Sequence, residues 1–173
     1  MNRIAMIVAL ALGASAACGR HSADEAGAAN STPADVDSTS FSLRLAGVDK
    51  GDFVSARMRI KSVQITDGAN VLADGVKTPE VDLARMDQAW LLATFQPPAG
   101  VEDVEFTVTF EGGSVATGTA SYDVDARCQT LRIAGKVSQV AQRRHAVIHL
   151  DVARSFVPST SGVLLVPHFQ LVY

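Results

Sequence analysis

The segment His149-Leu150-Asp151 contains two of the residue types from which hydrolytic sites are built. Residues two apart on a strand point to the same face, so an imidazole and a carboxylate would share one face here. A hydrolase also needs a nucleophile and oxyanion donors, and the sequence has no G-x-S-x-G segment. Two interpretations remain: a hydrolase using His149 and Asp151, or a solvent-facing pair opposite an inward set. That inward set is Ala146, Ile148, Leu150 and Val152.

Metal-binding patterns are weak in this sequence. His145, His149 and His168 show no zinc-ligand spacing, so we expect no metal site and no cofactor. Asp123-Val124-Asp125 could offer oxygens to calcium, but it lacks the glycine and distal glutamate of an EF-hand loop. A solvated strand end is the favoured interpretation of this acidic pair.

Arg57, Arg59 and Lys61 form a basic row on one strand face. The row could bind an anionic polysaccharide or lipid headgroups. Alternatively, it could pair across strands with acidic and polar residues, at a few tenths of a kcal/mol per pair, which is the favoured interpretation. Trp90, the single tryptophan, could stack on a sugar ring, although one isolated aromatic is more often part of a core.

The N-terminus has the three parts of a secretory signal. One positive charge at Arg3 precedes the apolar run Ile4–Leu12, and small residues follow as far as Ala17. The apolar run is shorter than the roughly 20 residues that cross a bilayer. Residues 1–17 are therefore predicted to be a cleaved signal peptide.

Cys18 directly follows this signal and has three possible roles. Ser15-Ala16-Ala17-Cys18 resembles the bacterial lipobox, which implies a lipidated cysteine carrying acyl chains such as palmitate. Ordinary cleavage after Ala16 is the alternative, and a disulfide with Cys128 is the weakest option. Without that disulfide, Cys128 is expected to be a small buried hydrophobe. Gly19 after the cysteine resembles the signal for outer-membrane export.

Residues 19–40 are small, polar and aperiodic, which is typical of a flexible tether. A flexible chain of this length has an r.m.s. span of about 25 Å. A folded domain attached to a lipid needs such a spacer, whereas a disulfide partner does not. The tether therefore favours lipid anchoring over a soluble periplasmic or secreted protein.

The 173 residues are 47% hydrophobic and 19% charged, with a net charge of −3. This composition is typical of one globular domain with an apolar core. It gives no basic excess that would indicate a nucleic-acid partner.

From residue 41 onward, apolar residues alternate with polar ones at the period of a β-strand. The alternation changes phase within residues 53–66, which predicts a β-bulge near Lys61-Ser62. Residues 90–95 could form a strand or a short helix capped by Asp87, and we predict a strand. Gly112-Gly113 predicts a chain reversal. The later strands are expected at 116–124, 129–134, 146–152 and 163–172.

These features predict an all-β fold, a two-sheet antiparallel β-sandwich of about seven to nine strands. The expected domains are a signal peptide at 1–17, the lipidated cysteine and tether at 18–40, and the sandwich at 41–173.

The sandwich region resembles an uncharacterised β-sandwich domain family of bacterial lipoproteins, with a carbohydrate-binding or transthyretin-like fold. The resemblance rests on "FSLRLAGVDKGDFVSARMRIKSVQI", "EVDLARM", "PPAG" before "VEDVEFTVTF", "HLDVARSFV" and "GVLLVPHFQLVY". Gly100-Val101 departs from the Gly-Tyr usual in that family. The resemblance implies the fold and a lipoprotein context, and it carries over no catalytic residue.

We therefore expect a non-enzymatic, lipid-anchored envelope module that binds a ligand or has a structural role. Its membrane contact would be the lipid on Cys18, with the outer membrane as the expected location. A polysaccharide or another envelope protein is the expected partner. The alternatives are an envelope hydrolase using His149 and Asp151, and a soluble secreted carbohydrate-binding domain.

Overall fold

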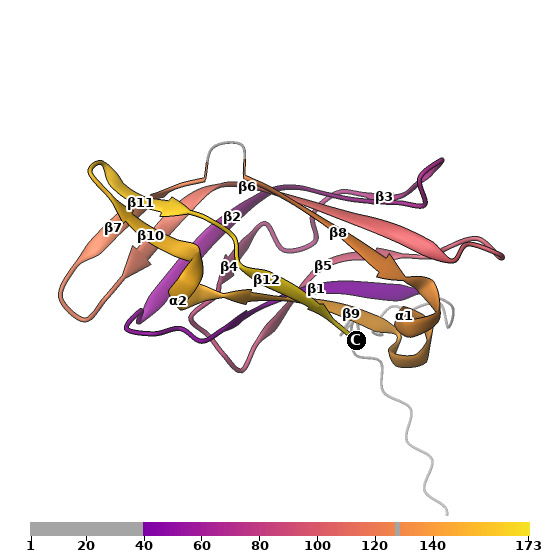
Figure 1. Cartoon of the computed structure of the whole chain (residues 1–173), viewed down its shortest axis with the longest axis horizontal. Helices are drawn as coiled ribbons and strands as arrows, with labels where there is room; N and C mark the ends of the chain where they lie inside the picture. The colour runs from indigo at the N-terminus through magenta and orange to yellow at the C-terminus, as the bar shows by residue number, and fades with distance from the viewer. Residues whose placement is uncertain (1–39, 127–128) are drawn as a thin grey trace, which may run out of the picture. The chain divides into compact units, whose positions relative to one another are not determined.

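The computed structural model describes residues 40–126 and 129–173, all within one compact unit, Asp35–Tyr173. The described residues form an all-β sandwich of two stacked sheets (Figure 1), as the sequence predicts. They contain twelve strands and two short helices, more strands than the expected seven to nine.

The smaller sheet has four strands. In spatial order these are β12 (Phe169–Val172), β9 (His145–Asp151), β1 (Phe41–Val48) and β5 (Ala89–Phe95).

The larger sheet has eight strands. Its main path is β10 (Phe156–Ser159), β11 (Gly162–Leu165), β7 (Ser121–Asp125), β6 (Asp103–Ala116), β2 (Ser55–Thr66) and β3 (Val71–Asp74). Off this path, β4 (Glu80–Asp82) pairs with β2, and β8 (Thr130–Lys136) pairs with β6.

The chain passes repeatedly between the two sheets, and two strand pairs are parallel. β1 pairs with β9, and β7 with β11, both in the parallel sense. α1 (Val137–Arg143) carries the chain from β8 in the large sheet to β9 in the small one. Alternation along single strands does not reveal strand direction, so the sequence predicted an antiparallel sandwich throughout.

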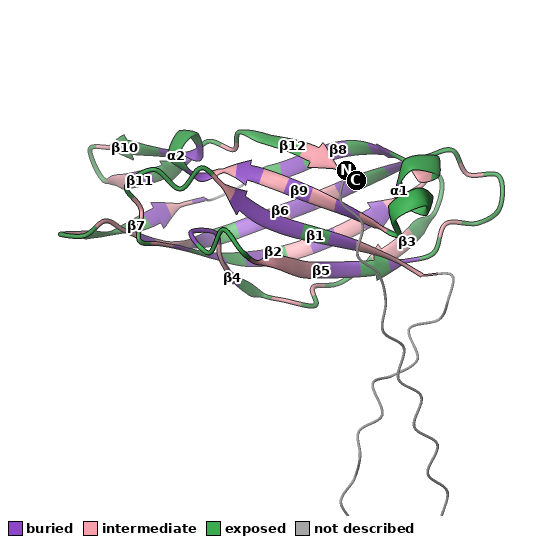
Figure 2. Ribbon diagram, turned by 90° about the horizontal axis from the view of Figure 1, so that it is seen from below, coloured by how far each residue is buried: buried purple, intermediate pink, exposed green. Residues whose placement is uncertain are grey.

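The core lies between the sheets and follows the predicted alternation. Bands of buried and exposed residues follow one another along the strands (Figure 2). The ring centroids of Phe95 in β5 and Phe106 in β6 lie 5.6 Å apart in an edge-to-face arrangement, which joins the two sheets. The buried core cluster lies entirely between Leu43 and Leu165, within the sandwich.

The bulge predicted near Lys61-Ser62 is confirmed. Ile60 pairs with Phe110 and Ser62 with Thr109, so Lys61 has no residue opposite it in β6. A second irregularity in the same ladder bulges Glu111 out of β6. The bulge at Lys61 lets both apolar sets of β2 face the core.

The predicted reversal at Gly112-Gly113 is wrong, because β6 runs straight through both residues. Gly112 has a φ of 145° beside the Glu111 bulge. A Cβ on Gly113 would lie 2.0 Å from the carbonyl oxygen of Arg57. Gly112 therefore belongs to a bulge, and Gly113 allows a close approach of two strands. Both features require glycine, as a turn often does.

Two of the expected later strands are interrupted. The range 116–124 contains a turn, closed by the N–H of Thr117 donating to the carbonyl of Ala120 at 2.9 Å. The range 163–172 divides into β11 and β12, because residues 166–168 carry the chain from the large sheet to the small one.

The ambiguous residues 90–95 form part of strand β5, as predicted. One side of β5 pairs with β1. On its other side the N–H of Lys77 donates to the carbonyl of Leu92 at 2.9 Å, and the Thr78 hydroxyl donates to that of Leu91 at 2.7 Å. These contacts cover part of an edge that would otherwise be free to pair with another chain.

Candidate functional site

The candidate site lies where β9 ends and turns into α2 (Val152–Ser155), a single helical turn. Asp151 is the N-cap of this turn, and its Oδ1 accepts the backbone N–H of Arg154 at 2.9 Å. The N–H of Ala153 donates to the carbonyl of Asp49 at 2.8 Å, which ties α2 to the loop after β1. These bonds fix the position of the Arg154 backbone, from which its side chain extends to the cleft.

Ser155 holds the segment that precedes β12. Its side chain is fully buried, and its hydroxyl oxygen accepts the backbone N–H of His168 at 2.9 Å. The same hydroxyl donates to the carbonyl of His168 at 3.4 Å, and the N–H of Asp151 donates to that carbonyl at 2.9 Å. Both the N–H and the carbonyl of His168 are therefore hydrogen-bonded, which fixes its backbone.

Strand pairing brings the remaining residues to the same place. β12 pairs antiparallel with β9, which sets Gln170 opposite His149. β1 pairs parallel with β9, which sets Val48 opposite Asp151. Paired residues point to the same face of a sheet, so these four side chains meet on the outer face of the small sheet.

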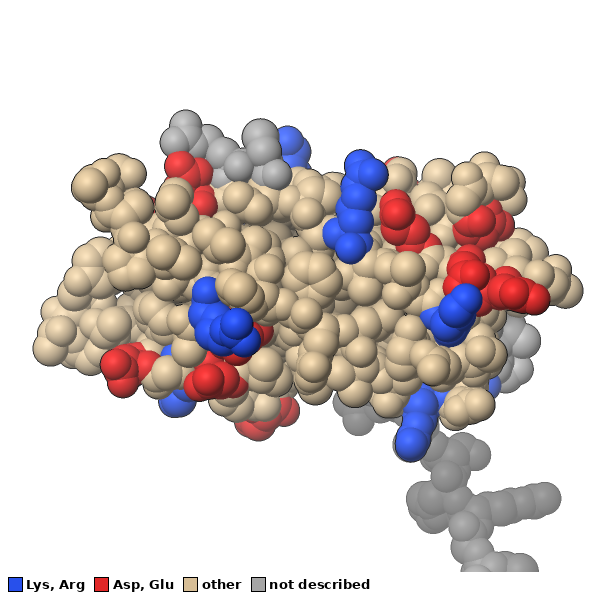
Figure 3. Space-filling view, viewed as in Figure 1, with Lys and Arg blue, Asp and Glu red and all other residues tan. Residues whose placement is uncertain are grey.

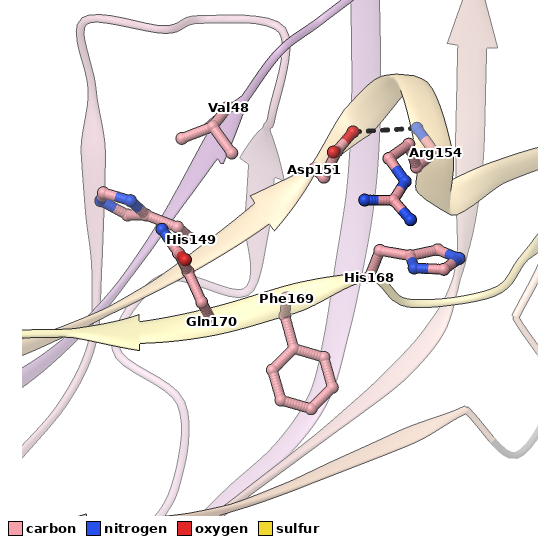
Figure 4. A pocket seen from close by; sticks show the side chains of 7 residues that line it. All are labelled: Val48, His149, Asp151, Arg154, His168, Phe169 and Gln170. Atoms are coloured by element: carbon pink, nitrogen blue, oxygen red, sulfur yellow. Dashed lines mark hydrogen bonds between the residues drawn. The ribbon is translucent and has the colours of Figure 1, made fainter.

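Together these residues form a cleft of about 260 Å³. Figure 4 shows the guanidinium of Arg154 near Asp151 and His168, while the ring of Phe169 points away from the imidazole of His149. The lining residues are Val48, His149, Asp151, Arg154, His168, Phe169 and Gln170.

The donor set of this cleft suits a small acidic ligand. A guanidinium is always charged and forms paired hydrogen bonds with a carboxylate or phosphate. Two imidazoles and an amide add donors, while one oxygen of Asp151, the single carboxylate in the lining, is occupied by the helix cap. None of the lining residues carries a hydroxyl or thiol that could act as a nucleophile.

The structure places His149 and Asp151 on the same face of β9, opposite the buried residues predicted to face inward. It brings His168 into the same cleft but leaves His145 at the other end of β9. Among the residues described, no group of three or more His, Cys, Asp or Glu is arranged to hold a metal ion.

The basic row Arg57, Arg59 and Lys61 is exposed on the outer face of the large sheet, with acidic groups among it. The Nε of Arg59 lies 3.6 Å from the Oε2 of Glu111. Glu80 lines the same shallow hollow as Arg57 and Arg59. Acidic and basic side chains are also scattered together on the side of the molecule that Figure 3 presents. The acidic neighbours Glu111 and Glu80 support cross-strand pairing for the row.

Trp90 lies in β5, half-buried against the core. Its indole N–H donates to the carbonyl of Asp82 at 3.4 Å. Its register partner across the ladder is Leu45, which is fully buried, so the indole lies on the core side of the sheet. This position gives more support to a packing role than to a sugar-stacking platform.

Asp123 and Asp125 both lie on β7, as the sequence indicated, and line a hollow with Arg59 and Glu111. Cys18 and Cys128 lie outside the described residues. Within the described parts of the chain, no helix is long and apolar enough to cross a membrane.

Several residues of the cleft were not identified from the sequence. Gln170 and Val48 reach it through long-range strand pairing, which leaves no local pattern, and Arg154 reaches it through the helical turn α2 directly after β9. Ser155 had one local signal, because a polar residue stands between the inward-facing Val152 and Phe156. A serine on the buried side of such a segment indicates a hydroxyl with hydrogen-bond partners.

No protein-family model matches the chain, and no curated protein or solved structure matches it significantly. The resemblance to a lipoprotein domain family therefore stays a prediction.

Proposed function

We propose that this protein is a non-enzymatic binding module of the bacterial cell envelope, anchored by a lipid on Cys18, which holds an acidic ligand in the His149–Gln170 cleft. The cleft carries this proposal, because it combines a guanidinium, two imidazoles and an amide on one rigid framework. A uronic acid of an envelope polysaccharide fits both this donor set and the expected location.

The hydrolase alternative has less support. Asp151 has a structural task as the cap of α2, and its Oδ1 accepts the N–H of Arg154. The nearby hydroxyl of Ser155 is fully buried and bonded to the backbone of His168. A nucleophile has to be exposed to substrate and hydrogen-bonded to its base.

Binding is tested by calorimetric titration with oligogalacturonate and with its methyl ester, which lacks the negative charge. We expect the acidic form to bind and the ester to bind far less. Arg154→Gln should weaken binding of the acidic form by about tenfold or more, because a charge-assisted bond is lost. Arg132→Gln, on the large sheet, is the charge-matched control. Equal binding of acid and ester, or no effect of Arg154→Gln, would contradict the proposed ligand class.

The anchor is tested separately by the intact mass of the mature protein from membranes, compared with a Cys18→Ser form. We expect acyl mass on Cys18 in the first and none in the second. A mature chain that begins at an unmodified Ala17 would overturn the lipid anchor. Hydrolysis of the oligosaccharide that disappears in His149→Ala would support the enzyme alternative.

A further inference from the structure

The two outer faces of the sandwich differ sharply in charge. The strands of the large sheet carry five basic and eight acidic side chains. The four strands of the small sheet carry only Arg44 and Asp151, besides two histidines. A surface depleted of charge beside a charged one marks a face that contacts something other than water.

One row across the outer face of the small sheet is nearly all aliphatic. Arg44 of β1 pairs with Leu91 of β5 on one side and with Val147 of β9 on the other. Val147 in turn pairs with Val172 of β12. The three aliphatic side chains are half-buried by their neighbours, whereas Arg44 is exposed. The row is therefore an apolar surface with one guanidinium in it.

Beside this row lies a second cleft, of about 460 Å³, which holds two guanidiniums and no carboxylate. Arg44 and Arg144 line it, together with Leu91 and the hydroxyl groups of Ser42 and Thr94. Two cations facing an otherwise neutral cleft are suited to phosphate, to which guanidinium binds in a bidentate manner.

Arg144 is held at this cleft by its backbone as well as by its side chain. It ends α1 in the left-handed conformation, with a φ of 61°, where glycine or asparagine is usual. Its Nη2 donates to the carbonyl of Ser40 at 3.3 Å, and its own carbonyl accepts the N–H of Ser42 at 3.1 Å. The guanidinium is thus fixed where the chain joins the sandwich.

The position of this cleft along the chain indicates its partner. Ser40 lines the cleft and ends the predicted tether, so only residues 19–40 separate it from Cys18. A flexible segment of that length spans about 25 Å, which would keep the cleft at high effective concentration near a lipid-anchored terminus. The rest of the molecule would not seek an anionic surface, because the chain has a net charge of −3.

We infer that the outer face of the small sheet around Arg44 and Arg144 docks onto the anionic phospholipid headgroups of the membrane to which the protein is anchored. The inference rests on the proposed lipid anchor. Docking places the end that bears Ser40 against the bilayer. The His149–Gln170 cleft lies further along the same face, at Val48, four residues or roughly 13 Å beyond Arg44 in β1.

The test uses the chain from residue 18 with Cys18→Ser, which keeps the whole buried core and carries no lipid. Pelleting with phosphatidylcholine vesicles, with and without phosphatidylglycerol, measures the affinity of the docking face alone. We expect binding only to the anionic vesicles, weakened by added salt. Arg44→Gln and Arg144→Gln should each lower the affinity about fivefold.

The control is Lys61→Gln with Arg132→Gln, which removes the same charge from the large sheet. We expect less than about a twofold change, because these side chains lie on the other face. Val147→Glu places an acid in the row with both arginines intact, and it should also lower binding. Circular dichroism and thermal melts identify any variant that has lost its fold.

The matching test variant carries Arg44→Gln and Arg144→Gln together. Equal losses in this variant and in the control would overturn the inference, since binding would then follow net charge. Absence of binding to anionic vesicles would overturn the docking inference as well. The proposed lipid anchor would still stand in that case if the mature protein carries acyl mass on Cys18. Conversely, an unmodified Cys18 would remove the anchor even if the arginine-dependent vesicle binding were observed.

Discussion

The buried hydroxyl of Ser155 accepts the backbone N–H of His168 at 2.9 Å and donates to the carbonyl of the same residue at 3.4 Å. One side chain thus fixes the segment that crosses from the large sheet to β12. β12 brings Gln170 to the cleft. The candidate binding site therefore depends on Ser155, although the side chain of Ser155 does not line the cleft.

Ser155→Ala removes the hydroxyl that accepts the N–H of His168. We expect a loss of about 0.5–1.5 kcal/mol in the free energy of unfolding, the net contribution of a typical hydrogen bond. Urea denaturation measures it. Ser138→Ala, at an exposed position of α1, is the control and should change stability by less than about 0.5 kcal/mol. Equal effects of the two substitutions would show that the hydroxyl of Ser155 contributes little.

Asp151→Ala removes the cap of α2, whereas Asp151→Asn keeps an oxygen that can accept the N–H of Arg154. We expect the alanine variant to lose about 0.5–2 kcal/mol in unfolding free energy and the asparagine variant to lose much less. Thermal melts of the two proteins compare them directly. Equal destabilisation would mean that the negative charge, rather than the capping bond, is what matters.

Gly47→Ala introduces a Cβ that would lie 1.8 Å from the carbonyl oxygen of Leu83, a backbone atom that cannot move aside cheaply. Overpacking of this kind costs about 1–3 kcal/mol or more, and we expect at least that loss in unfolding free energy. Gly118→Ala, where no heavy atom lies within 4 Å, is the matched control. A stable Gly47→Ala protein would show that the strands have room to separate here.

The pKa of the Asp67 carboxyl is lowered mainly by the backbone N–H of Asn70, then by the side-chain amide of Asn70 and the N–H of Ala69. Since the folded pKa lies below the unfolded one, the stability that it contributes is present at neutral pH. That stability is lost as the pH falls below the ordinary aspartate pKa and through the lower, folded value. An NMR titration should show a depressed midpoint that rises in Asn70→Ala. A midpoint at or above the ordinary aspartate value would contradict the hydrogen-bonded turn.

The strand faces could be predicted because each depends only on neighbours along the chain. The phase change at Lys61 was enough to locate a bulge, since a one-residue slip reverses which side chains are buried. Gly112-Gly113 misled for a related reason: glycine allows a reversal, a bulge and a close strand approach alike. Only the contact of Gly113 with the backbone of Arg57 separates these cases.

The candidate site could be predicted only in part. His149 and Asp151 share a face because they lie two apart on one strand, and the sequence shows this directly. Gln170 and Val48 join them through pairings between distant strands, and one of those pairings is parallel. The periodicity along a single strand does not indicate which strands become neighbours, so the cleft could not be predicted from it.

The order of strands in the small sheet has a consequence for how the protein folds. The large sheet contains pairs of consecutive strands, such as β6 with β7 and β10 with β11, which can close as hairpins. No two neighbours in the small sheet are consecutive in the chain. Its strands must wait for long loops to close, which makes their pairing slow. We therefore expect the ligand cleft to be among the last features to form, so ligand binding would report that the whole chain has finished folding.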